Sequence, residues 1–315
     1  MIKHPALIIP ILFAALLASI AVSVCIGVTG FDLLSLDGDT VHKIFLDIRL
    51  PRVLGACLVG LGLAAAGCAM QGLFRNPMAD PYILGTSAGG SLGAACAIAF
   101  LGGMFLPVFA FAGSLLSTIL VYIISKRNGR MSVETVLLSG IAISLFLSAL
   151  LSFIMYLSGG SLQKIMFWTM GGLWNMSWSQ VGTGLLVLIG CAVLFFFSRD
   201  LNILTLGEED AIHLGVNTER LKKLLLLVSA FITAVAVSIS GCIGFVGLII
   251  PHIMRSFTGP DHRILLPASM LSGALLLIWA DTLARTLPAE IPVGIITAFL
   301  GAPFFIYLLR RRTKV

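Results

Sequence analysis

The sequence predicts an all-α integral membrane protein with ten transmembrane helices and several short interfacial helices. Only 11% of the 315 residues are charged and 58% are hydrophobic, with a mean hydropathy of +1.07. A soluble domain carries about 25% charged residues, so a large water-facing domain is excluded. The apolar runs are hydrophobic on every face, as in Ile11–Ile26, instead of alternating, which indicates helices and not strands. At about 20 residues per crossing, the chain has room for roughly ten.

The helices follow from apolar runs that end at turn residues. They are expected at 6–28, 53–73, 83–101, 104–125, 135–157, 181–198, 224–240, 243–257, 266–284 and 292–309. All of them belong to one transmembrane domain, 1–315. The first run follows Lys3 and is longer than the core of a signal peptide, so we expect a retained helix. A lipoprotein cleavage site is not expected, because Val24, a bulky residue, precedes Cys25.

Small residues mark the third helix, where Gly85, Gly89 and Gly93 form two stacked GxxxG steps. Such glycines let helix backbones approach closely, and they also leave room beside a pathway. Both alternatives stay open from the sequence. After the fifth helix, the stretch 158–180 holds three of the four tryptophans, which is typical of a helix lying at the membrane surface.

Two interruptions shape the second half of the chain. Arg199–Lys223 is a long hydrophilic stretch, which we expect to face the cytoplasm as a segment of about 199–223. Gly241, Gly244 and Gly247 precede Pro251, so a broken helix is expected there. Irregular backbone at membrane depth persists only inside protein or beside a cavity, which makes 241–251 a candidate cavity wall.

The distribution of lysine and arginine predicts that both termini are cytoplasmic. An even number of helices places both ends on one side, and cations concentrate on the inside. Fifteen of the 20 basic residues then fall inside: Lys3, Arg75, Lys126, Arg127, Arg130, Arg199, Arg220, Lys222, Lys223, Arg255, Arg263, Arg310, Arg311, Arg312 and Lys314. The other five are Lys43, Arg49, Arg52, Lys164 and Arg285. The net charge of +6 therefore reflects topology and not binding of nucleic acid.

The sequence contains no convincing motif for catalysis or for ATP binding. GxSxG occurs once, as Gly85-Thr-Ser-Ala-Gly89, but it opens a predicted membrane helix instead of following a strand. The pattern GxxxxGK[ST] has no match, so ATP and magnesium would have to be bound by a separate chain. HExxH is absent, and the six cysteines lack the spacing of a metal site, so neither an enzyme nor a metal site is expected. The helix interiors carry few charges such as Asp281, which argues against an ion-coupled carrier. An ATP-independent secondary carrier or channel stays the alternative.

Several blocks read together resemble the membrane permease of FecCD-type ABC importers for iron-siderophores, haem and vitamin B12. They are Asp47-Ile-Arg-Leu-Pro-Arg52, Gln71-Gly-Leu-Phe-Arg-Asn-Pro-Met-Ala-Asp-Pro81, Leu84-Gly-Thr-Ser-Ala-Gly89, Leu206-Gly-Glu-Glu209, Gly244-Phe-Val-Gly-Leu-Ile-Ile-Pro-His252, Ala280-Asp-Thr-Leu-Ala-Arg285 and Leu300-Gly-Ala-Pro-Phe304. The resemblance covers nearly the whole chain. It implies the fold of a type II ABC importer permease, in the cytoplasmic membrane, which works as a homodimer.

The resemblance also implies partners and roles. Two ATP-binding subunits would bind inside and one extracytoplasmic binding protein outside. Arg49 and Arg52, three residues apart and able to point the same way, would meet carboxylates of the binding protein together with Arg285. Two short helices separated at Gly215 would couple to the ATPase, with Ala211, Leu214 and Val216 as the buried anchor. The coupling residues are Gly207, Glu208, Glu209, Ala211, His213, Leu214, Gly215 and Val216.

The inner mouth of the pathway is the remaining expected site. Asn76 and Met78 at the inner end of the second helix, and the turn at 130–135 with Val133 and Glu134, correspond to regions that narrow this mouth in the family. The function implied is import of an iron chelate, with iron-siderophore as the first expectation. Haem, a corrinoid or an oxyanion are the alternatives.

Overall fold

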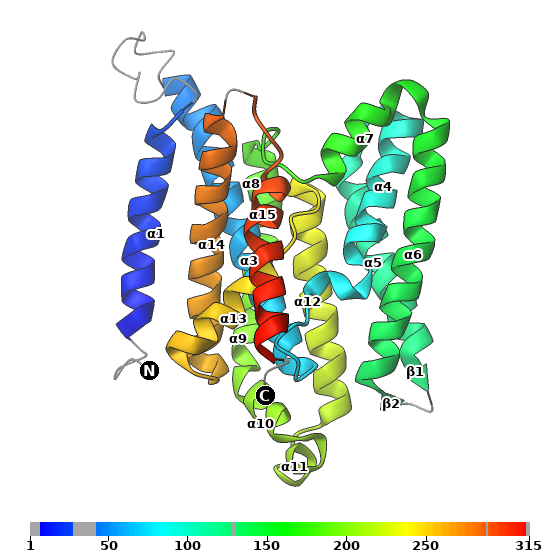
Figure 1. Cartoon of the computed structure of the whole chain (residues 1–315), viewed down its shortest axis with the longest axis vertical. Helices are drawn as coiled ribbons and strands as arrows, with labels where there is room; N and C mark the ends of the chain where they lie inside the picture. Colours follow the sequence, from blue (N-terminus) through cyan, green and yellow to red (C-terminus); the bar gives the residue numbers. More distant parts are fainter. Residues whose placement is uncertain (1–6, 28–41, 128–129, 288, 313–315) are drawn as a thin grey trace.

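The computed structural model describes residues 7–27, 42–127, 130–287 and 289–312, and nearly all of them are helical (Figure 1). The first half consists of α1 (Ile8–Cys25), the π-helical turn η3 (Ile44–Arg49), α3 (Leu50–Leu73), the 3-10 turn η4 (Pro81–Leu84), α4 (Thr86–Leu101), α5 (Leu106–Ser125), β1 (Lys126–Arg127), β2 (Arg130–Met131) and α6 (Val133–Leu157). The second half consists of η5 (Gly159–Ser161), α7 (Leu162–Thr169), α8 (Trp178–Gly184), α9 (Leu186–Phe196), α10 (Ser198–Leu206), α11 (Glu208–His213), α12 (Thr218–Ser240), α13 (Val246–Thr258), α14 (His262–Thr286) and α15 (Val293–Arg312).

Every predicted membrane range overlaps one of these helices. Among the described residues, seven helical stretches are long and apolar enough to cross a membrane: Ile8–Cys25, Ile44–Leu73, Leu106–Ser125, Val133–Leu157, Trp178–Phe196, Thr218–Ser240 and His262–Thr286. Two shorter apolar stretches, Thr86–Leu101 and Val293–Leu308, add to them. The chain is therefore a multi-pass helical membrane protein, and the total of ten crossings stays a prediction.

The helix α3 forms the centre of the bundle, since almost every residue from Pro51 to Leu73 is buried. It packs along α14 with no side chains between the two backbones at Gly60 and Gly273. A methyl group at either glycine would overlap the carbonyl oxygen of the other. Without a hydrophobic drive inside lipid, such backbone contact is a main source of helix association.

The glycines of the third predicted helix are explained by packing. A methyl group at Gly89 would overlap the carbonyl oxygen of Gly113 in α5, and one at Gly93 would overlap that of Phe109. Gly85 has a left-handed backbone (φ 74°) at the turn into α4. The contacts therefore favour the packing alternative, and no pathway is needed to account for these residues.

The expected break after α12 is confirmed, because residues 241–245 are not helical between the end of α12 at Ser240 and the start of α13 at Val246. Tyr82, in the connection between α3 and α4, satisfies this segment. Its hydroxyl donates to the carbonyl oxygen of Ile243 at 3.0 Å and accepts from the Ile243 amide at 3.1 Å. Gln71 donates to the carbonyl oxygen of Leu248 at 3.0 Å. Through the Tyr82 hydroxyl, the connection between α3 and α4 and the break after α12 are thus hydrogen-bonded to each other inside the bundle.

Candidate functional site

Two arginines hold the C-terminal end of α1. Nη1 of Arg49 donates to the carbonyl oxygens of Val24 at 3.2 Å and Cys25 at 3.1 Å. Nη2 of Arg285 donates to the carbonyl oxygen of Ser23 and to its hydroxyl, the latter at 2.7 Å. The last carbonyl groups of a helix lack intrahelical partners and carry partial negative charge, so cations stabilise this end.

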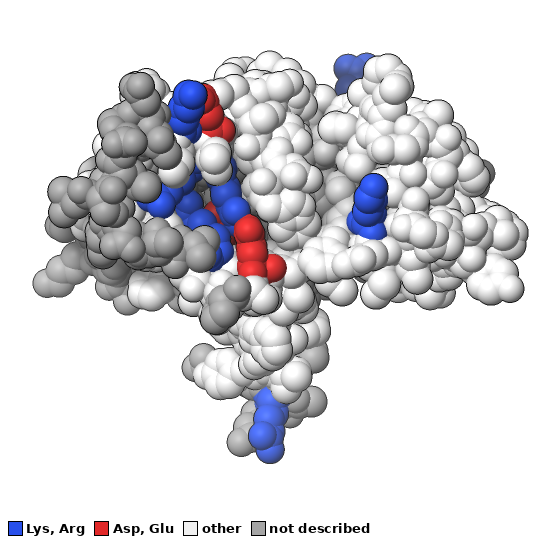
Figure 2. All heavy atoms as spheres, turned by 90° about the horizontal axis from the view of Figure 1, so that it is seen from above, with Lys and Arg blue, Asp and Glu red and all other residues white. Residues whose placement is uncertain are grey.

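The third arginine, Arg52, forms a buried ion pair with Asp281. Its Nε lies 3.0 Å from both carboxylate oxygens of Asp281, and Nη2 lies 2.8 Å from Oδ1. Asp281 is 1% exposed. The remaining nitrogen, Nη1, lies 2.5 Å from Oε1 of Glu290, whose side chain is 39% exposed. Figure 2 shows acidic and basic side chains together at one side of this end of the bundle, beside the undescribed residues.

These contacts change the expected geometry of the arginines. Arg49 reaches the end of α1, whereas Arg52 reaches Asp281 in α14. Arg52 and Arg285 are both buried, with 8% and 5% exposure. Only Arg49 is partly exposed, so of the three arginines it is the one accessible to a carboxylate from outside the chain. Docking of a binding protein on them stays a prediction.

The hydrophilic segment forms two short helices, α10 and α11, that extend beyond the bundle (Figure 1). They are separated at Gly207, with φ 150° and ψ 156°. Gly215 has a left-handed backbone (φ 84°) and follows the end of α11 at His213. The expected break at Gly215 therefore lies between α11 and α12, but the helix after it is the long α12 and not a second short helix.

The exposed apolar residues of this segment also differ from those expected. Ala211 is fully buried within the chain, so the prediction that it anchors a partner is wrong. Val216 is half-buried, whereas Leu206, Ile212 and Leu214 are exposed at 67%, 59% and 60%. Glu209 and His213 are also exposed. Three large apolar side chains on a solvent-facing segment form a surface suited to contact with another protein.

Two sets of polar contacts fix α10 and α11 to the bundle. Nζ of Lys222, a buried residue of α12, lies 2.7 Å from Oε2 of Glu208. Nδ2 of Asn202 in α10 donates to Oδ1 of Asp261 at 2.6 Å, and its Oδ1 accepts from the His262 amide at 2.9 Å. Burial raises the pKa of Asp261, but hydrogen bonds from the Arg263 amide and Asn202 outweigh it and hold the pKa below its ordinary value.

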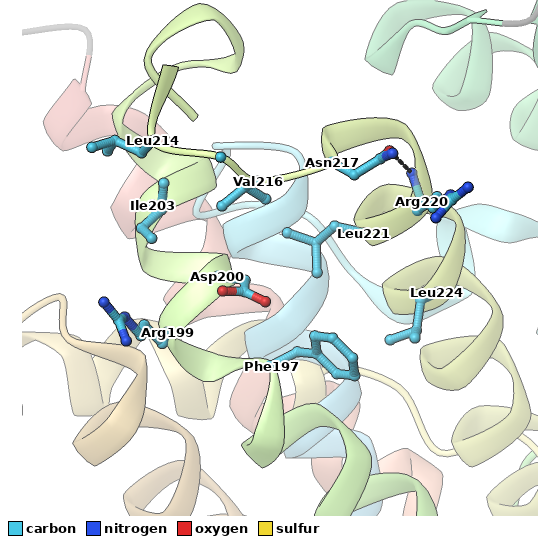
Figure 3. Close-up of a pocket in the computed structure, with 11 residues that line it drawn as sticks. Phe197, Arg199, Asp200, Ile203, Leu214, Val216, Asn217, Arg220, Leu221 and Leu224 are labelled. Atoms are coloured by element: carbon cyan, nitrogen blue, oxygen red, sulfur yellow. Dashed lines mark hydrogen bonds between the residues drawn. The ribbon is translucent and has the colours of Figure 1, made fainter. Parts of the chain in front are cut away.

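A pocket of about 460 Å³ lies between α10 and α12 at this end of the bundle. Figure 3 shows Val216 and Leu221 facing each other across it. Asn217 caps α12 by accepting from the Arg220 amide at 3.1 Å. As a result α12 begins at Thr218, six residues earlier than expected, and extends into the predicted coupling segment.

The residues expected at the inner mouth lie in two separate turns. Oδ1 of Asn76 accepts from the Met78 amide at 3.1 Å, which closes a tight turn after α3. Val133 begins α6, where the Ser132 hydroxyl accepts from the Thr135 amide, and Glu134 is exposed in the first turn. A role in gating stays a prediction for all four. Cys242, at the break after α12, lies with its Sγ 3.2 Å from the hydroxyl of Ser91.

Several contacts were not predicted from the sequence, because their partners are far apart in the chain. Asp281 lies 229 residues from Arg52, and Ile243 lies 161 residues from Tyr82. The one local signal is that Asp281 is a charged residue inside an otherwise apolar helix, where a charge usually has a partner. No group of three or more His, Cys, Asp and Glu side chains able to hold a metal ion occurs among the described residues.

Comparison with known proteins gives the family. A profile of the FecCD transport family matches residues 7–311. The chain is 48% identical over 277 residues to the cobalamin import system permease protein BtuC of Halobacterium salinarum, covering 87% of this chain and 75% of the relative. It is 44% identical over 287 residues to the hemin transport system permease protein HmuU of Yersinia pestis, covering 88% and 86%.

A solved structure agrees with the sequence comparisons. A metal-chelate type ABC transporter in an inward-facing conformation matches with a TM-score of 0.87 at 35% identity, covering 96% of this chain and 99% of that one. The family profile spans almost all of the described helices, from α1 to α15. The chain is therefore a membrane permease of the FecCD transport family.

Proposed function

We propose that this chain is the permease subunit of an ATP-driven importer for a metal chelate, either an iron-siderophore, haem or a corrinoid. The relatives with the names cobalamin import permease and hemin transport permease support this cargo class. The termini face the cytoplasm, and the chain works as a homodimer with two ATP-binding subunits inside and a binding protein outside. ATP hydrolysis takes place in the partner subunits.

The observation that carries the proposal is the apolar surface of α10 and α11. This segment projects beyond the bundle and is otherwise hydrophilic, so its exposed side chains Leu206, Ile212 and Leu214 do not face lipid. Exposed apolar side chains rimmed by charges are typical of a protein interface. The ion pair of Lys222 with Glu208 connects this surface to α12, so a displacement of α11 is transmitted to the bundle.

The proposed second copy of the chain covers α15. A pocket of about 500 Å³ on this helix is lined almost wholly by apolar groups from Met170, Gly294, Ile295, Ala298, Phe299, Ala302 and Pro303. Phe299 and Ile306 are largely exposed on the same helix. A bulky chelate would pass between two such faces, where small residues leave room.

The proposed binding protein docks at the opposite end, where Arg49 is the accessible cation. Its guanidinium group already satisfies two carbonyl groups of α1, and a carboxylate could accept from the remaining donors. Glu290 then borders the docking surface, since it pairs with Arg52 from the exposed side.

The proposal is tested by purifying the tagged chain from its native host and identifying the chains that co-purify. The complex is then placed in liposomes, and uptake of labelled cobalamin, haem and iron-siderophore is measured with and without ATP. We expect an ATPase in equal amount and uptake of one chelate only with ATP. Uptake by the isolated chain, driven by an ion gradient and indifferent to ATP, would instead establish a secondary carrier.

A pair of variants tests the docking surface directly. Ile212→Asp with Leu214→Asp should reduce ATPase co-purification by more than about tenfold, because each aspartate replaces an apolar contact of about 1.5 kcal/mol or more. Lys126→Gln, an exposed position at the same end of the bundle but outside α10 and α11, is the matched control and should change it less than twofold. Equal ATPase recovery from all variants would refute the assigned surface.

A further inference from the structure

A second pocket, of about 510 Å³, lies at the end of the bundle opposite α10 and α11. It is formed by the end of α4, the start of α5, the helix α7 and the loop that follows α7. The lining residues are Ile98, Gly102, Gly103, Leu106, Gln163, Lys164, Phe167, Trp168, Trp174 and Asn175. An adjoining cavity of about 150 Å³ shares four of these residues, Leu106, Trp168, Trp174 and Asn175, and extends toward α12.

Aromatic side chains form the wall of this pocket. The rings of Phe167 and Trp174 meet edge to face, with centroids 6.2 Å apart. Trp174 also lies against Gly172, where a methyl group would overlap the indole ring. On the other side, Gly102 and Gly103 have left-handed backbones and nothing within 4 Å of where their side chains would begin. The wall is therefore fixed, and the glycine side of the pocket is open.

The pocket carries hydrogen-bond donors that no described residue uses. Five polar side chains of the pocket donate no hydrogen bond to another described residue. They are the ammonium group of Lys164, the amides of Gln163 and Asn175, and the indole nitrogens of Trp168 and Trp174. Lysine and tryptophan can only donate. No carboxylate lines the pocket. The complementary ligand carries an oxyanion on an apolar body.

The position of α7 identifies where such a ligand comes from. Leu162, Met166 and Phe167 are exposed apolar residues of this helix, which caps the end of α4 and α6. Exposed aromatic and apolar side chains at the end of a membrane bundle mark the level of the lipid headgroups. An amphiphile in that leaflet reaches the pocket directly, with its headgroup level with Lys164.

We propose that this pocket binds an anionic glycerophospholipid. The phosphate group accepts hydrogen bonds from Lys164 and from the indole and amide donors, and the start of an acyl chain lies along Phe167 and Trp174. Free phosphate lacks the apolar part that this wall would cover, so it binds more weakly. The inference goes beyond the transport function and does not depend on which solute is carried.

The test is native mass spectrometry of the purified full chain, titrated separately with phosphatidylglycerol, phosphatidylcholine and inorganic phosphate. We expect tighter binding of phosphatidylglycerol than of phosphatidylcholine, and no retained phosphate. Lys164→Gln should weaken phosphatidylglycerol about fivefold, the effect of one basic residue near a lipid surface. Lys43→Gln is the matched control, because Lys43 is also exposed but lies outside the pocket, and it should change binding less than twofold.

A second measurement keeps the pocket separate from a general charge effect. Phosphatidylglycerol with brominated acyl chains should quench the tryptophan fluorescence of the protein. Lys164→Gln should weaken this quenching, and Trp174→Phe should remove most of it. Equal affinity for the two lipids, equal losses in Lys164→Gln and Lys43→Gln, or retention of phosphate alone would each overturn the proposal.

Discussion

The ion pair of Arg52 with Asp281 allows a quantitative prediction. Asp281→Asn leaves the guanidinium group buried with one weaker acceptor in place of a carboxylate that receives three short contacts. Removing one partner of a buried pair costs about 3–5 kcal/mol. Because Glu290 still pairs with Nη1, we expect the lower end of that range, about 3 kcal/mol. Glu290→Gln should cost at most about 1 kcal/mol, since that carboxylate is partly in water.

The measurement is denaturant unfolding of the detergent-purified chain, followed by tryptophan fluorescence. Trp279 lies two residues before Asp281 and donates to the Ser19 hydroxyl at 3.1 Å, so it reports contact of α14 with α1. The double variant Arg52→Met with Asp281→Leu should regain most of the lost stability, because apolar residues replace both charges. The reasoning is refuted if Asp281→Asn costs less than about 1 kcal/mol, or if the double variant is no more stable than Asp281→Asn.

Three further predictions follow from contacts described above. Tyr82→Phe should lower the free energy of unfolding by about 1–3 kcal/mol, because it leaves the Ile243 amide unsatisfied, whereas Tyr156→Phe at an exposed site should not. Lys222→Ala should reduce ATP-driven uptake in liposomes about tenfold, since a bond to a charged group worth about 1.5–3 kcal/mol no longer fixes α11; unchanged uptake would contradict this. The lowered pKa of Asp261 stabilises the folded state above the unfolded value of about 3.9, and this is lost as pH falls through the folded value. Asp261→Ala should therefore reduce the acid sensitivity of unfolding seen in the parent chain.

The helices could be predicted because each depends on local hydropathy, and the break after α12 could be predicted because its three glycines and Pro251 lie within eleven residues of the sequence. The partner of Arg52 could not, since Asp281 becomes its neighbour only when α3 and α14 pack at Gly60 and Gly273. The arginines lie near the expected end of the bundle, but the sequence has no information on which way each guanidinium group turns.

The coupling segment shows a second limit of the same kind. The resemblance implies two short helices separated at Gly215, but the additional break at Gly207 and the length of α12 after Gly215 depend on how the helices pack. Ala211 is apolar like Leu214, yet the first faces the bundle and the second faces solvent. Exposure of a side chain on a six-residue helix depends on a rotation that hydropathy does not determine.

The shared hydrogen bonds between the two irregular segments also bear on how the chain enters the membrane. At about 1.5 Å per residue, the 16 residues of α4 and the 13 of α13 fall short of a hydrocarbon core of about 30 Å. Each is therefore short for a crossing by itself, and α4 packs against α5 and α6. The Tyr82 hydroxyl gains its two bonds to Ile243 only after the second half of the chain has been synthesised, so the first half of the permease takes its final hydrogen bonding last during biogenesis.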